Sequence, residues 1–184
     1  MHGFPSPQQT RVADMPVAGH RRVVRVAVFL AYAVGGLVLS SAAHAAGLPV
    51  RVLLPLHWVV LVGGLAFGWR AGLLLGVMSP AFTLLFSGLP SVVWVAPMAV
   101  ELALYGMVAG LGHGQRHMWR YIGLAVLAGR LGWLAVSLAV QDAPSAAVAV
   151  ALAGGLAPGL FAAAAQIALV PPVARWLDRV TRGA

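Results

Sequence analysis

Apolar runs long enough to cross a lipid bilayer dominate the hydrophobic and polar pattern of this chain. A bilayer core about 30 Å thick requires roughly 20 apolar residues in a helix that rises 1.5 Å per residue. Glycine, proline and charged residues separate the runs, which predict helices at residues 23–43, 52–67, 71–86, 92–111, 121–140 and 146–170. The joints at Gly68 and Gly88 are so short that the helices they connect must be neighbours. We therefore predict an all-α membrane protein with six transmembrane helices.

Composition agrees with this prediction. Of the 184 residues, 61% are hydrophobic and 9% are charged, whereas a soluble domain carries about 25% charged residues. Residues 1–20 contain three prolines and little apolar periodicity, which predicts a flexible cytoplasmic N-terminal tail ahead of a single transmembrane domain at 21–184. An alternative for the first run is a signal peptide cleaved near Ala43 and Ala45, although a polar stretch precedes its arginines.

Arginine is distributed unequally between the two sides of the predicted membrane. With the N-terminus in the cytoplasm, ten of the twelve arginines lie inside, whereas Arg51 lies outside and Arg130 lies within a helix. The positive-inside rule therefore predicts that both termini are cytoplasmic. Anionic lipid headgroups attract such arginines, so the net charge of +8 needs no nucleic-acid partner.

Several kinds of chemistry are excluded by composition. The chain has neither cysteine nor lysine, which excludes disulfides, thiolate metal ligands, a P-loop lysine and a Schiff base. No HExxH zinc motif is present, and Ser79 lacks the Gly-x-Ser-x-Gly elbow of a nucleophile that could act with His57. His113 and His117 are expected to be solvated in a cytoplasmic loop. We predict no enzymatic activity, no metal and no cofactor.

Small residues recur at the four-residue spacing that lets helix backbones approach closely in lipid. The repeats are Gly68, Gly72 and Gly76; Gly106, Gly110 and Gly114; Gly155 and Gly159; and Ala27, Ala31 and Gly35. We expect most of them to pack helices within the bundle. The repeat in the first helix is the best candidate for docking a partner protein.

Two opposite charges are predicted at the same depth in the membrane. Glu101 and Arg130 each lie about ten residues from a helix end, which places both roughly 15 Å deep. An intramembrane charge costs at least about 2.5–3.5 kcal/mol, so both should face the bundle interior and are plausibly paired. The pair predicts either a substrate clamp, in which Arg130 binds a carboxylate or phosphate, or a structural ion pair.

Aromatic side chains share helical faces with these charges. Trp94 and Tyr105 lie on the face of Glu101, and Trp133 lies on the face of Arg130. Aromatic rings around a few polar groups suit a flat heterocycle with hydrogen-bonding edges.

Residues 54–112 contain a set of motifs that resembles a known family. The motifs are P-x-H at Pro55 and His57, the glycine repeat from Gly68 to Gly76, Ser79-Pro80, the loop Ser87-Gly88-Leu89-Pro90, and P-M-x-x-E-L-x-x-Y-G ending at Gly106. They resemble the substrate-binding S components of energy-coupling factor (ECF) vitamin transporters. The resemblance covers about a third of the chain.

The resemblance implies an S-component-like bundle in the bacterial cytoplasmic (inner) membrane. Such a protein captures a vitamin or vitamin precursor from the outside and delivers it inward with a membrane coupling subunit and cytoplasmic ATPases. The stripe Ala27, Ala31 and Gly35 would dock the coupling subunit. Tyr105 is added to the residues that the resemblance selects, because it lies on the helical face of Glu101. The substrate-binding residues expected are His57, Trp58, Thr83, Ser87, Trp94, Glu101, Tyr105, Arg130 and Trp133.

The sequence leaves the cargo and one alternative function open. Pantothenate, a pyrimidine-like or purine-like precursor and a cobalamin-related ring all fit the predicted site. The alternative is a six-helix membrane scaffold or morphogenetic protein without a ligand, in which the Glu101–Arg130 pair holds the bundle together. Oligomeric state is not determined by the sequence.

Overall fold

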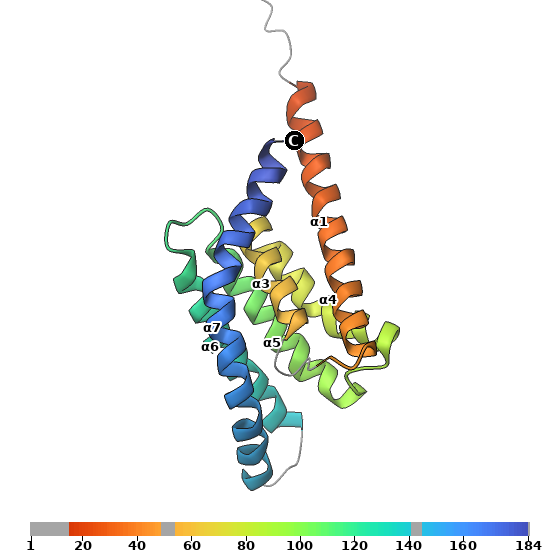
Figure 1. Cartoon of the computed structure of the whole chain (residues 1–184), viewed down its shortest axis with the longest axis vertical. Coiled ribbons are helices and arrows are strands. Elements are labelled where there is room, and N and C mark those ends of the chain that lie inside the picture. The colour runs from red at the N-terminus through yellow and green to blue at the C-terminus, as the bar shows by residue number, and fades with distance from the viewer. Residues whose placement is uncertain (1–14, 49–53, 141–144, 184) are drawn as a thin grey trace, which may run out of the picture.

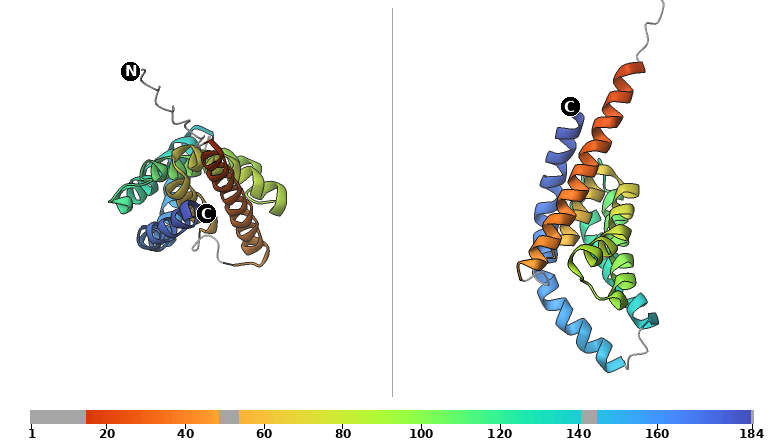
Figure 2. Two further views of the ribbon diagram at one scale, coloured as in Figure 1. Left: turned by 90° about the horizontal axis from the view of Figure 1, so that it is seen from above. Right: turned by 90° about the vertical axis from the view of Figure 1, so that its right-hand side faces the viewer.

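The computed structural model is helical throughout the part of the chain that it describes. It describes the backbone of residues 15–48, 54–140 and 145–183, and the side chains of 22–48, 54–140 and 159–181. The helices are α1 (Met15–Ala45), α3 (Pro55–Phe67), α4 (Trp69–Ser87), α5 (Val92–Leu111), α6 (Met118–Val140) and α7 (Ser145–Gly183). The long helices α1 and α7 lie along one face of the shorter ones (Figure 1 and Figure 2).

Five of the described helices contain a segment long and apolar enough to cross a membrane. These segments are Arg22–Ala45, Trp69–Ser87, Val92–Leu111, Met118–Val140 and Gly159–Thr181. The run predicted at 52–67 corresponds to α3, which has 13 residues and is therefore only about 20 Å long. The lengths and apolar character of these helices are those of a multi-pass membrane protein.

The two outer helices extend further than the apolar runs predict. α1 begins at Met15, within the segment 1–20 expected to be a tail. α7 continues through Pro171 and Pro172 to Gly183 instead of ending at residue 170. The buried side chains of this extension recur at helical spacing, at Val170, Ala174, Leu177 and Thr181. Packing of that face stabilises the extension of α7. The charged residues between the buried ones lower the hydropathy there, so the apolar pattern of the sequence does not predict it.

α3 forms the centre of the bundle. Ten of its residues are buried, including Val60 and Leu61 at 0% exposure, and it contacts α1, α4, α5 and α7. A helix that is apolar all round belongs inside a protein or in lipid, and here the neighbouring helices cover it. Because its neighbours cover it, α3, the shortest of the described helices, has the largest share of buried residues among them.

Glycines bring α3, α4 and α5 into backbone contact. A Cβ on Gly64 or on Gly72 would collide with the carbonyl oxygen of Gly106, and a Cβ on Gly106 would collide with Gly72. These glycines therefore pack helices, as the spacing predicts. Gly68 and Gly114 differ from that expectation, because they lie outside the helices with φ angles of 98° and 74°, in the region that favours glycine.

Both outer helices reach the same arginine-rich end of the molecule. The N-terminal end of α1 and the C-terminal end of α7 extend past the other helices on one side (Figure 1 and Figure 2). At this end the Arg25 guanidinium lies 3.2 Å from the Nε2 atom of His113, and Arg175 donates to the carbonyl oxygen of Arg116. The start of α1, the end of α7 and the α5–α6 loop therefore meet at this end of the molecule.

The glycine contacts predict a position-specific cost of adding one methyl group. Gly72→Ala should destabilise the protein by about 2–3 kcal/mol, because two helix backbones would have to separate. Gly123→Ala is the matched control, since nothing lies within 4 Å of an added Cβ at that helical position. The control should be neutral or more stable by up to about 1 kcal/mol. Thermal unfolding in detergent measures both, and equal melting temperatures would contradict the role of the glycine junction.

Candidate functional site

Glu101 is the buried charge around which the predicted site residues gather. It lies near the middle of α5, and its side chain is 4% exposed. Its Oε1 atom lies 3.1 Å from the Nη1 atom of Arg130 on α6 and 3.5 Å from the Nε2 atom of His57 on α3. Three helices therefore contribute one polar side chain each to a single cluster, and the two predicted intramembrane charges contact each other.

The local packing explains why Arg130 reaches Glu101. Gly129 lies directly against the Tyr105 ring and the backbone of Glu101, so α6 approaches α5 closely at this level. A side chain at position 129 would push the helices apart and lengthen the Arg130–Glu101 contact. The Tyr105 ring in turn packs edge-on against the His57 ring, with 5.0 Å between the centroids.

Several polar atoms of the cluster have no hydrogen-bond partner in the described protein. They are the two ring nitrogens of His57 and the Oε1 atom of Glu101, whose contacts are ion-pair contacts without hydrogen-bond geometry. Buried polar atoms are normally satisfied, and leaving one unsatisfied costs about 1–3 kcal/mol. The cluster can therefore accept further polar contacts from a bound group.

Arg130 is the most accessible member of the cluster. Its side chain is 28% exposed, compared with 4% for Glu101, and its Nη2 atom lies 3.0 Å from the position that a Cβ on Gly159 would occupy. The guanidinium thus extends between α6 and α7, and Gly159 leaves room for it. Arginine has five N–H donors in a planar fork, of which the Glu101 contact engages one nitrogen.

Two indole rings lie beyond the charged cluster, on the side away from the arginine-rich end. Trp94 of α5 and Trp133 of α6 are nearly parallel, with 8° between their planes and 6.0 Å between their centroids. Trp133 follows Arg130 by three residues, so it shares its helical face. The structure therefore brings four of the predicted residues into one cluster, His57, Glu101, Tyr105 and Arg130, and pairs two others, Trp94 and Trp133, with each other.

The remaining predicted residues occupy other surroundings. The buried Thr83 hydroxyl donates to the carbonyl oxygens of Ser79 and Pro80, and the Ser87 hydroxyl donates to that of Thr83. Their side chains are therefore engaged by the backbone of α4. Trp58 packs half-buried against the hydrophobic core.

The small-residue stripe of α1 faces outward. Ala27, Ala31 and Gly35 are exposed, and nothing lies within 4 Å of a Cβ added to Gly35. This stripe thus differs from the glycines of α4 and α5, which pack within the bundle. It is a free surface in the described protein.

The contacts of His113 were not anticipated from the sequence. His113 was expected to be solvated, but its Nδ1 atom lies 2.9 Å from the carbonyl oxygen of Leu65 while its Nε2 atom faces Arg25. The His113 ring therefore links α1, α3 and the α5–α6 loop. The glycines on both sides of His113 mark a loop, but no sequence signal identified its partners.

The Glu101–Arg130 contact predicts a specific pattern of stability. Glu101→Gln or Arg130→Met should each destabilise the protein by about 3 kcal/mol, because the remaining charge loses its partner inside the membrane. The double variant should lose less stability than the two single variants together, since no charge is then left uncompensated. Unfolding of the four proteins in detergent measures this coupling, and strictly additive losses would contradict an interaction between the two side chains.

Among the described residues, no group of three or more histidine, aspartate or glutamate side chains could hold a metal ion. Comparison of the chain with protein-family models, curated proteins and solved structures gives no match. Function must therefore be argued from these residues and their geometry.

Proposed function

We propose that this protein is the substrate-binding membrane subunit of an ECF-type importer. It captures a vitamin or vitamin precursor from the outside and delivers it inward with an ATPase-driven partner module. The observation that carries the proposal is Arg130, a cation halfway along a helix that is long and apolar enough to cross a membrane. Intramembrane charges of this kind commonly mark a solute pathway.

The charge state of the cluster favours a polar or anionic group on the solute. Glu101 neutralises Arg130 through one oxygen, and the guanidinium retains donors that can receive a carboxylate or phosphate in bidentate fashion. His57 lies beside Glu101, with its Nε2 atom 3.5 Å from the Oε1 atom. Its unsatisfied ring nitrogens can also pair with the edge of a heterocycle.

The paired indoles favour a ligand with a flat ring. Trp94 and Trp133 present parallel faces on the helices that carry Glu101 and Arg130. Aromatic stacking on such faces contributes about 0.5–1.5 kcal/mol beyond the area it buries. Pantothenate, a pyrimidine-like or purine-like precursor and a cobalamin-related ring remain the candidate cargoes.

Topology supports six crossings with both termini on one side. The N-terminal end of α1 and the C-terminal end of α7 both lie at the arginine-rich end (Figure 1), which favours an even number of crossings. With five long helices, α3 would be the sixth crossing, and because neighbouring helices cover it, it would not need a full-length apolar surface. The positive-inside rule favours a cytoplasmic location for the arginine-rich end, and the family resemblance implies a bacterial inner membrane.

The exposed α1 stripe is the surface we assign to the coupling subunit. Small residues allow a partner helix to approach closely in lipid, and Ala27, Ala31 and Gly35 are not used inside the bundle. The ATPases of the module would supply the energy for transport.

A structural scaffold is the second candidate, and the closed Glu101–Arg130 contact favours it. Such a pair can connect α5 to α6 without any ligand. The two functions differ in what the cluster is needed for, which makes them separable by experiment.

Gently purified protein should contain a stoichiometric vitamin-like compound detectable by mass spectrometry of released small molecules. Protein that is empty, and that no compound from a panel of vitamins and precursors stabilises against heat, would favour the scaffold.

The charge-balanced variant separates binding from stability. Glu101→Gln combined with Arg130→Met should keep a folded bundle but bind the identified compound at least about tenfold more weakly, because the charge-assisted contacts are lost. Arg120→Met on the same helix is the control, because Arg120 lies over the Trp119 ring at the arginine-rich end. Unchanged affinity in the balanced variant would contradict a substrate role for the pair.

Removing one indole should weaken binding of a ring-containing compound. Trp133→Leu is expected to lower affinity about tenfold through lost stacking. Trp119→Leu, which removes an exposed indole from the same helix, should leave affinity unchanged. Isothermal titration of the two variants measures the difference, and equal affinities would remove the indole pair from the site.

A further inference from the structure

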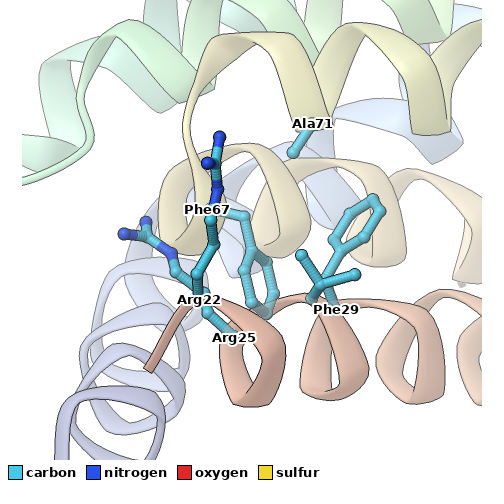
Figure 3. A pocket seen from close by; sticks show the side chains of 6 residues that line it. Arg22, Arg25, Phe29, Phe67 and Ala71 are labelled. Carbon is cyan, nitrogen blue, oxygen red and sulfur yellow. The ribbon is translucent and has the colours of Figure 1, made fainter. Parts of the chain in front are cut away.

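A second site lies at the arginine-rich end, away from the Glu101 cluster. It is a pocket of about 350 Å³ between α1 and the α3–α4 joint, lined by Arg22, Arg25, Val26, Phe29, Phe67 and Ala71. Figure 3 shows the two guanidinium groups rising from α1 beside the Phe67 and Phe29 rings. The wall from α1 is therefore cationic at one side and apolar at the other.

The described lining of this pocket contains two arginines and no carboxylate. The ion pairs of the Glu101 cluster involve neither Arg22 nor Arg25. Arg25 instead faces the Nε2 atom of His113 at 3.2 Å, which holds its guanidinium in place without cancelling its charge. Two adjacent guanidiniums of this kind favour an anion with several acceptor oxygens, such as a phosphate ester.

The first turn of α4 lies at the opposite wall, where Ala71 lines the pocket. α4 begins after Gly68 without a side-chain cap. The start of a helix carries partial positive charge, which favours an anion as the two arginines do.

Exposed apolar side chains continue from the pocket along both helices. On α1, Val26 and Leu30 are 51% and 54% exposed, and on α4, Leu74 and Met78 are each 55% exposed. Leu74 and Met78 follow Ala71 at helical spacing, so they lie on the same face. A phosphate group in the pocket would thus have apolar tracks beneath it in the membrane, which a soluble anion cannot use and a lipid acyl chain can.

We propose that this pocket binds the phosphate group of an anionic phospholipid and that the bound lipid ties α1 to the α3–α4 joint. α1 exposes most of its apolar side chains, so a lipid shared between α1 and α4 would add contacts where the protein provides few. The site is independent of the proposed importer function and would exist equally in a scaffold.

Native mass spectrometry of the full-length protein in detergent tests the proposal with phosphatidylglycerol as the probe. The wild type should retain one phosphatidylglycerol more tightly than phosphatidylcholine. Arg22→Gln combined with Arg25→Gln should weaken its retention at least about tenfold. Ala71→Phe should do the same by filling the pocket while leaving both arginines in place, and Arg22→Gln alone tests the charge without disturbing the His113 contact.

The matched control removes two arginines from the same end but outside the pocket. Arg116→Gln combined with Arg120→Gln should leave phosphatidylglycerol retention unchanged. Equal weakening in this control would show diffuse attraction to the arginine-rich end and overturn the proposal. Inorganic phosphate that binds the wild type as tightly as phosphatidylglycerol would also overturn it, because the acyl tracks would then contribute nothing.

Discussion

The backbone contact of three helices at Gly106 is the constraint on which the rest of this structure depends. Gly64 and Gly72 meet Gly106 so closely that a Cβ on either one would collide with its carbonyl oxygen. In lipid, apolar burial supplies no net force between helices, so association relies on close packing. The junction therefore determines how α3, α4 and α5 are spaced and brings His57 of α3 within 3.5 Å of Glu101.

The interior charges follow from that spacing. Glu101 is tolerable in the bundle because Arg130 and His57 reach it from the two neighbouring helices. The same close approach leaves polar atoms of His57 and Glu101 without hydrogen bonds, which is a cost that packing alone does not require. A bound solute would offset that cost, which adds to the argument from Arg130 for the importer proposal.

Arginine has two different roles in the molecule. Arg130 is compensated inside the bundle by a carboxylate, whereas Arg22 and Arg25 line a pocket whose described lining residues include no carboxylate. The outer helix α1 is held more loosely than α3, since its stripe of small residues and many of its apolar side chains are exposed. Its outward surface can meet lipid or a partner while the central helices keep the Glu101 cluster in place.

The sequence by itself determined the helical class and the depth of the charges. Long apolar runs interrupted by glycine, proline and charge predict helices because both lipid and the 1.5 Å rise impose a length on them. The same arithmetic predicts that Glu101 and Arg130 lie at one level, and their contact confirms it. The four-residue spacing of Gly72, Gly76, Gly106 and Gly110 likewise predicts helix packing, which the structure confirms.

Only the tertiary structure decided which of several similar residues contact one another. Thr83 and Ser87 are predicted to bind substrate, and the structure adds that their hydroxyls bind the backbone of α4, which hydropathy does not encode because it does not specify side-chain hydrogen bonds. His113 was expected in solvent, yet it joins Leu65 and Arg25, since loop contacts depend on which helices end together. The extension of α7 beyond residue 170 was missed for a related reason, because its charged residues hide a buried face that exists only once α7 packs against the bundle.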